Sequence, residues 1–233
     1  MIELLDPEKI DPVAYKKGRL KEICRFSLLP GKRIGWNYCM DYTWLSSRYE
    51  KYIKKRMKVV DIGCGPGAIH GYLEKKHGVK IIGIDMNRWE KDYVDYVGDY
   101  SDAAFRCKCG IENGSIDLII STSAFEHNTL EEHMALVNAC LSTLKKGGRL
   151  ITTFSASPGR VRYSKNENRG DLSKEAIEKI YNDKFEEFDY KSVWKRWRKH
   201  RDIPRAFKKR YGWYKWTSFS PPFLSVGADV GKK

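Results

Sequence analysis

Residues 59–85 read VVDIGCGPGAIHGYLEKKHGVKIIGID, and they indicate the architecture of the chain. One apolar run leads into a glycine-rich loop at 63–67, and a second apolar run ends in Asp85. This order of strand, loop, helix and strand is typical of a parallel sheet in an α/β domain. The expected elements are a strand over Lys58–Ile62, a helix over Gly67–His77 that Gly78 ends, and a strand over Lys80–Ile84.

The same alternation continues along the chain. Ile116–Ser121 is continuously apolar, as expected of a buried parallel strand. Strands that alternate with helices predict a sheet covered by helices on both faces. The further expected elements are strands over Tyr93–Val97, Arg149–Phe154, Phe185–Ser192 and Phe223–Val230, and helices over Leu130–Leu144 and Leu172–Lys184, the latter capped by Ser173 or Asp171.

Length and composition limit the class of protein. A chain of 233 residues fits one large α/β domain with an insertion. No run approaches the roughly 20 apolar residues of a membrane span, and the first residues lack the pattern of a signal peptide, so we expect a cytoplasmic protein. The six cysteines are scattered, and the close pair at 107 and 109 lacks a second pair of ligands; we expect no metal site.

The positive charge is concentrated in one segment. The formal net charge is +14, and residues 191–216 hold eleven Lys or Arg against the single acid Asp202. An acidic partner is therefore expected to dock there. We divide the chain into an N-terminal helical lid or substrate segment, 1–57, and a main domain, 58–233, with a basic aromatic insertion at about 193–216.

The glycine-rich loop predicts a nucleotide-like ligand. Gly63 permits a tight turn, and Gly65 lets the backbone approach a ligand closely. Asp85 stands where an acid accepts hydrogen bonds from ribose hydroxyls, and the spacing also fits a dinucleotide fingerprint. Asp61, just before the loop, repels a pyrophosphate and suits a cationic cofactor, which argues against NAD.

Five stretches together resemble a known family: VVDIGCGPG, IIGIDMN, VGDYSDA, DLIISTSAFEH and LKKGGRLITTF. They are similar, in the right order over about 58–155, to the motifs of class I S-adenosylmethionine-dependent methyltransferases. FLSVGADV is similar to the antiparallel last strand of that fold. The resemblance implies a Rossmann-like seven-stranded sheet, mostly parallel with an antiparallel last strand, and S-adenosylmethionine as cofactor, with S-adenosylhomocysteine as product.

The resemblance also implies roles for individual residues. It places the methionyl part of the cofactor against Asp61, Gly63 and Gly65, with Cys64 in the same loop. It places the ribose hydroxyls on Asp85 and the adenine beside Met86, with Asp99 accepting from the adenine amino group. It also implies that Tyr100 stacks nearby and that the segment from Ser121 to Phe125 passes beside the sulfonium. Other roles stay open, because Asp61 can bond loop amides and Asp99 can cap a helix.

The stretch after the fourth main strand bears on the acceptor. Ser121–His127 lacks the Pro-Pro-aromatic motif of base N-methyltransferases, and it resembles the corresponding stretch of small-molecule methyltransferases. The sequence also lacks the Pro-Cys pair that is typical of enzymes that methylate C5 of cytosine. His127 is then a candidate general base on a hydroxyl, with Glu126 as its orienting partner. In the alternative interpretation His127 caps or packs against the following helix. We expect O-methylation of a small or carbohydrate-like, anionic acceptor.

Two aromatic segments have alternative interpretations. Trp36 and Tyr38 suit a lid over the acceptor, whereas Tyr42, Leu45, Tyr49 and Tyr52 share one helix face and favour packing. The basic insertion suits an anionic acceptor, RNA or an anionic membrane surface, or it is a solvated helix packed through Trp194 and Trp197. Rival functions are therefore an RNA-modifying methyltransferase and a non-catalytic binding module. The candidate acceptor-binding residues are Trp36, Tyr38, Arg196, Arg198, Arg201 and Lys208.

Overall fold

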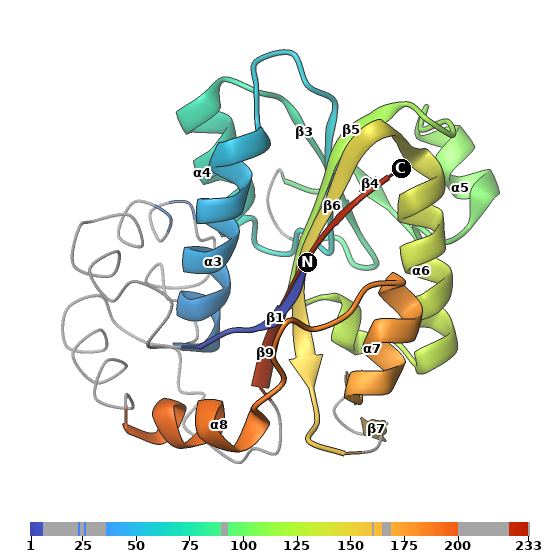
Figure 1. Cartoon of the computed structure of the whole chain (residues 1–233). Coiled ribbons are helices and arrows are strands. Elements are labelled where there is room, and N and C mark those ends of the chain that lie inside the picture. The colour runs from blue at the N-terminus through green and yellow to red at the C-terminus, as the bar shows by residue number, and fades with distance from the viewer. Residues whose placement is uncertain are drawn as a thin grey trace.

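The computed structural model describes residues 1–6, 23, 26, 36–89, 93–159, 161–164, 169–199 and 224–232. A seven-stranded sheet with the order β1-β9-β6-β5-β2-β3-β4 forms its centre (Figure 1). The strands are β1 (Ile2–Leu4), β2 (Val59–Ile62), β3 (Ile81–Asp85), β4 (Tyr96–Val97), β5 (Ile116–Thr122), β6 (Leu144–Ala156) and β9 (Leu224–Gly231), with a separate hairpin of β7 (Arg162–Ser164) and β8 (Arg169–Asp171).

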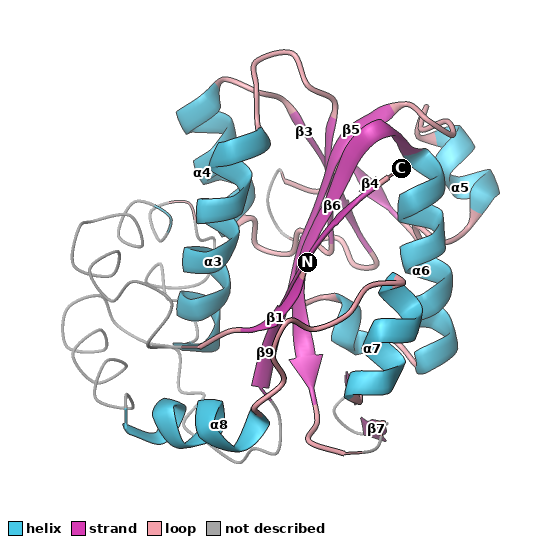
Figure 2. Cartoon of the chain, viewed as in Figure 1, coloured by secondary structure: helices cyan, strands magenta, loops and turns pink. Residues whose placement is uncertain are grey.

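Helices cover both faces of this sheet. Figure 2 shows α3 and α4 on one side and α5, α6 and α7 on the other. The α-helices are α3 (Trp36–Tyr52), α4 (Ala68–His77), α5 (Ala103–Lys108), α6 (Leu130–Thr143), α7 (Lys174–Tyr181) and α8 (Tyr190–Lys199). Within the described ranges, no helix is long and apolar enough to cross a membrane.

The pairing of the strands confirms the predicted fold class. β2 runs parallel to both β3 and β5, and β5 runs parallel to β6. The last strand, β9, pairs antiparallel with β6, with Thr152 opposite Ala228. The carboxyl ends of all parallel strands therefore lie on the same side of the sheet, where ligands bind in α/β folds. The loop at 63–67 follows the carboxyl end of β2 on that side.

The predicted strand over Phe185–Ser192 is wrong. Only Phe185 forms a bridge, parallel to Ile2, and α8 begins at Tyr190. Asp189 starts this helix, because its carboxylate accepts from the Ser192 amide at 3.1 Å, and Val193 and Trp194 then pack against the core. The place beside β9 belongs to β1, in a segment for which the sequence predicts helix and loop.

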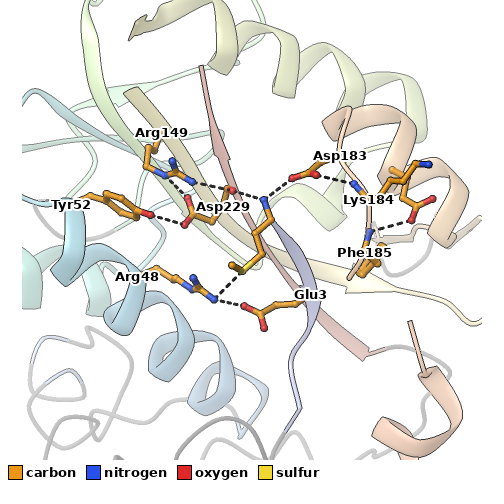
Figure 3. Close-up of polar contacts among 10 residues, drawn as sticks. Glu3, Arg48, Tyr52, Arg149, Asp183, Lys184, Phe185 and Asp229 are labelled. Carbon is orange, nitrogen blue, oxygen red and sulfur yellow. Dashed lines mark hydrogen bonds and ion pairs between the residues drawn. The ribbon is translucent and has the colours of Figure 1, made fainter. Parts of the chain in front are cut away.

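A polar network holds β1 and β9 to the neighbouring elements (Figure 3). The buried Asp229 carboxylate accepts from Arg149 Nε at 2.6 Å and from the Tyr52 hydroxyl at 3.3 Å. Glu3 accepts from Arg48 at 2.6 Å and from the Trp44 indole at 2.8 Å. Side chains of α3 and β6 thus fix the edge of the sheet.

Other expected elements occur with shifted bounds. α4 begins one residue later than predicted and ends at His77, followed by the cap residue Gly78, which has a left-handed backbone (φ 62°). The strand predicted over Tyr93–Val97 is β4 and is limited to Tyr96–Val97. The helix α7 is shorter than predicted, with Ser173 as its cap. In α3 the predicted packing face is confirmed for Tyr42, Leu45 and Tyr49, which are buried.

Candidate functional site

The glycine-rich loop is held against the next strand and against the loop after β5. The amides of Gly63 and Cys64 donate to the Ile84 carbonyl at 2.7 and 3.3 Å. Gly63 has φ +68°, and a Cβ on it would stand 2.2 Å from the Ala124 Cβ. Only glycine fits here, so the loop and the segment around Ala124 approach closely enough to face one ligand.

Asp85 is anchored at the end of β3. Its two carboxylate oxygens accept from the amides of Gly65 and Asn87, both at 2.9 Å. A carboxylate has about four acceptor positions, so the side chain retains acceptor capacity for ligand hydroxyls. Asp85 is half-buried, and its position beside the loop fits the predicted ribose role.

Asp61 is a buried carboxylate at the end of β2. Its exposed fraction is 1%, and its Oδ2 atom has no hydrogen-bond partner among the described residues. The alternative in which Asp61 bonds loop amides is not seen, because the Gly63 and Gly65 amides donate elsewhere. Asp61 Oδ2 instead lies 3.4 Å from His70 Nδ1. Burial raises the pKa of Asp61, while His70 opposes this rise.

Two exposed apolar side chains lie near Asp85. Met86 is 66% exposed and Trp89 is 42% exposed. Ring atoms of Trp89 lie 4.0 Å from the point where a Cβ on Gly65 would stand, so the indole borders the loop. These side chains offer apolar surface for a flat ring. Trp89 is a residue that the sequence analysis missed.

The two predicted adenine contacts beyond β4 differ from each other. Asp99 is exposed, and its carboxylate accepts from both the amide and the hydroxyl of Ser101 at 2.8 Å. The helix cap is the neighbouring Asp102, not Asp99. Tyr100 is buried in the core, and its hydroxyl lies 2.8 Å from Thr143 Oγ1. The prediction that Tyr100 stacks on a ligand is corrected, because its ring has no free face.

The side chains of Cys64 and Ser121 are engaged with the backbone. Cys64 Sγ lies 3.2 Å from the Tyr93 carbonyl, and the Ser121 hydroxyl donates to the Ile62 carbonyl at 2.7 Å. The Ser121 bond joins β5 to β2 directly below the loop. Both side chains are therefore engaged within the protein, and Ser121 is fully buried.

The candidate acceptor loop follows β5. Glu126 is buried and His127 is exposed in the 3₁₀ helix η2 (Phe125–His127). The interpretation of His127 as a helix cap is wrong, since Thr129 caps α6 in a capping box with Glu132. Ser123, at φ +48°, donates its hydroxyl to Asp41 Oδ2 at 2.7 Å, which ties α3 to this loop.

Asp41 and His70 are further site residues that the sequence analysis missed. Asp41 lies in α3, for which the sequence predicts a packing face of apolar residues. His70 lies in the first turn of α4. The signal for His70 was its spacing from Gly67, three residues, which turns it toward β2.

The basic insertion is described only at its start. Arg196 binds Asp6 through Nε–Oδ1 at 3.0 Å and Nη2–Oδ2 at 2.6 Å, so its guanidinium is engaged in an ion pair, and its role in holding the acceptor stays a prediction. Arg201, Lys208 and the side chains of Trp36, Tyr38 and Arg198 lie outside the described residues. Cys107 and Cys109 are free thiols, and no group of three metal-binding side chains occurs among the residues described.

The sequence of this chain also matches a known family. A family model described as "Methyltransferase domain" matches residues 41–207. The chain belongs to this methyltransferase family. The predicted resemblance to class I S-adenosylmethionine-dependent methyltransferases is thereby confirmed.

Named proteins similar to this methyltransferase-family chain differ in their acceptors. Phosphoethanolamine N-methyltransferase 1 of Zea mays is 26% identical over 46% of this chain and 23% of its own length. Chloroplastic tocopherol O-methyltransferase of Arabidopsis thaliana is 28% identical over 44% of this chain and 31% of its own length. The chain thus spans less than a third of the curated relatives that it matches.

A solved structure shows the same fold. Geranyl diphosphate C-methyltransferase of Streptomyces coelicolor, in complex with S-adenosyl-L-homocysteine, has a TM-score of 0.53 at 15% identity. The alignment covers 81% of this chain and 76% of that one.

The residues of this methyltransferase-family chain fit S-adenosylmethionine. Asp61 is a buried carboxylate whose Oδ2 atom has no hydrogen-bond partner among the described residues, and it suits an ammonium group. Gly63 lets the loop approach Ala124, Asp85 suits ribose hydroxyls, and Met86 offers apolar surface to an adenine ring.

Proposed function

We propose that the chain is an S-adenosylmethionine-dependent methyltransferase that acts on a hydroxyl of a small molecule. Asp61, Gly63, Gly65 and Asp85 hold the cofactor, with Met86 and Trp89 against its adenine ring. When bound, the cofactor supplies a methyl group on a positively charged sulfur. The segment at 123–127 borders the Gly63 turn, so an acceptor held by this segment would lie beside the cofactor site.

The single observation that supports this function is the contact between the two loops. Gly63 and Ala124 are so close that no Cβ fits at residue 63. His127 follows three residues later with an exposed ring. We propose that His127 takes the proton of the acceptor hydroxyl and that the buried Glu126 orients it.

An amine acceptor is the second candidate. Two buried carboxylates, Asp41 and Glu126, flank the loop after β5, and negative charge attracts an ammonium group. A relative of this chain is named for N-methylation of phosphoethanolamine. An amine that loses its proton in water needs less from a general base than a hydroxyl does.

The test is an acceptor panel assayed with the wild-type chain and His127→Ala. Release of S-adenosylhomocysteine is measured with matched small alcohols and amines, including phosphorylated and sugar-like members. Loss of a general base lowers kcat about 10²- to 10⁴-fold on alcohols, and His77→Ala, on α4, serves as control. Turnover confined to amines would favour the second candidate.

The remaining predictions compete within the same assay. Activity that requires RNA, together with RNA binding that falls steeply with salt, would favour the RNA-modifying interpretation. Absence of turnover with every acceptor, despite S-adenosylhomocysteine binding, would favour a binding module. A lid made by Trp36 and Tyr38, anion contacts by Arg198, Arg201 and Lys208, and a cytoplasmic location stay predictions.

A further inference from the structure

His70 is buried between two carboxylates beneath the glycine-rich loop. Its exposed fraction is 2%. Nδ1 lies 3.4 Å from Asp61 Oδ2, and Nε2 lies 3.7 Å from Glu74 Oε1, one helical turn further along α4. Glu74 is itself fixed, because the same oxygen accepts from the Ile81 amide at 2.9 Å. The imidazole therefore bridges a carboxylate of β2 and a carboxylate of α4.

The surroundings of His70 are negative on several sides. Asp61 faces it from β2, Glu74 from its own helix, and Asp95 from the loop before β4. The Tyr93 ring lies 5.1 Å from the imidazole, centroid to centroid. Burial by itself lowers the pKa of His70, but Asp61, Glu74 and Asp95 outweigh burial and raise it. Asp85 acts on the other partner, since its charge raises the pKa of Asp61.

A carboxylate buried as deeply as Asp61 takes up a proton unless a positive group compensates its charge. A protonated Asp61 would offer the cofactor no negative charge. His70 is the positive group within ion-pair distance, and its ring is held from the opposite side by Glu74.

We propose that His70, as an imidazolium, is a positioning residue that keeps Asp61 ionised and oriented toward the ammonium group of S-adenosylmethionine. This inference rests on the proposed placement of the methionyl part at Asp61. Cofactor affinity then depends on a proton held by a residue that need not touch the cofactor.

The first test is a nitrogen-detected NMR titration of the ring of His70 in the wild-type chain. Both ring nitrogens are expected to be protonated at pH 6.5, whereas the buried His133, whose pKa burial lowers to about 3, is expected to read as neutral in the same spectra. A neutral His70 ring at that pH would overturn the proposal. Because the measurement uses the wild-type chain, its outcome does not depend on whether a variant folds.

The second test measures the affinity for S-adenosylhomocysteine by calorimetry from pH 6 to pH 9. His70→Gln is expected to weaken binding about tenfold or more at pH 6 and to recover toward wild-type affinity at pH 9, where Asp61 ionises without help. His77→Gln, on the same helix, is the matched control and should bind as the wild type does. A constant ratio between His70→Gln and wild type at every pH indicates packing alone and contradicts the proposal.

Asp61→Asn tests the cofactor placement at Asp61 separately from the role of His70. It is expected to weaken binding and to abolish the additional effect of His70→Gln, since the asparagine does not ionise. If Asp61→Asn binds like the wild type, the cofactor placement fails. If Asp61→Asn weakens binding but His70→Gln leaves the pH dependence unchanged, only the role of His70 fails.

Discussion

At the scale of single residues, the site depends on Gly63, where both the backbone conformation and the neighbouring Ala124 disfavour a side chain. Gly63 has a left-handed backbone (φ +68°), which L side chains adopt at a cost, and its missing Cβ makes room for Ala124. Gly110 also has a left-handed backbone (φ +66°), but nothing lies within 4 Å of its missing Cβ. The two glycines thus separate backbone strain from steric conflict.

We expect Gly63→Ala to destabilise the fold by more than the ~1–3 kcal/mol of a strained backbone position and to abolish S-adenosylhomocysteine binding, because Ala124 must move. Gly110→Ala should lose only the stability that a strained backbone costs, and it should bind S-adenosylhomocysteine as the wild type does. Urea unfolding and calorimetry check both variants. Equal stability losses in the two variants would show that Ala124 yields without cost.

At the scale of elements, a buried histidine joins three of them on the other face of the sheet. His133 of α6 lies between the rings of Phe125 and Phe154 and stands 2.9 Å from the hydroxyl of Tyr181 on α7. It also hydrogen-bonds the Phe125 backbone in η2. This cluster fixes the 3₁₀ turn that presents His127.

The stability of this cluster should depend on pH. Burial lowers the pKa of His133 to about 3 in the folded state, so the unfolded chain binds a proton near pH 6.5 that the folded chain refuses. Unfolding free energy therefore falls as the pH falls, by about 2 kcal/mol between pH 8 and pH 5 from this group. His133→Gln, which does not titrate, should lose that part of the dependence in denaturant titrations.

Above pH 8 the two proteins should differ by a constant amount, which serves as the internal control. A wild-type minus variant difference that stays constant down to pH 5 would contradict the prediction.

At the scale of the whole molecule, the sheet is completed by residues from opposite ends of the sequence. β1 pairs with β9, and the Arg149–Asp229 pair and the Arg48–Glu3 pair hold them to β6 and α3. The opposite edge is the two-residue strand β4, whose side chains are exposed. The β1 edge is therefore part of the core, whereas the β4 edge is peripheral.

Ile2→Ala tests this difference between the edges. Ile2 is fully buried, so its truncation should cost about 2–5 kcal/mol, as in a core strand. Val97→Ala on β4 removes an exposed side chain and should change stability by no more than about 0.5 kcal/mol. Thermal unfolding checks both. A small loss for Ile2→Ala would mean that β1 frays from the sheet.

The sequence by itself determined the class of fold and the cofactor loop. Apolar runs such as Ile116–Ser121 and the glycines at 63 and 65 are local requirements of strands and tight turns, so they can be read without knowing what packs against them. The family followed from several such local patterns in a fixed order.

Only the tertiary structure decided which segments and side chains meet. It placed Ile2–Leu4, rather than a strand from 185–192, beside β9, turned Tyr100 into the core, and paired Arg196 with Asp6. It also brought His70 to Asp61. These outcomes depend on competition between distant segments for one buried edge or one buried charge, and no local periodicity encodes that competition.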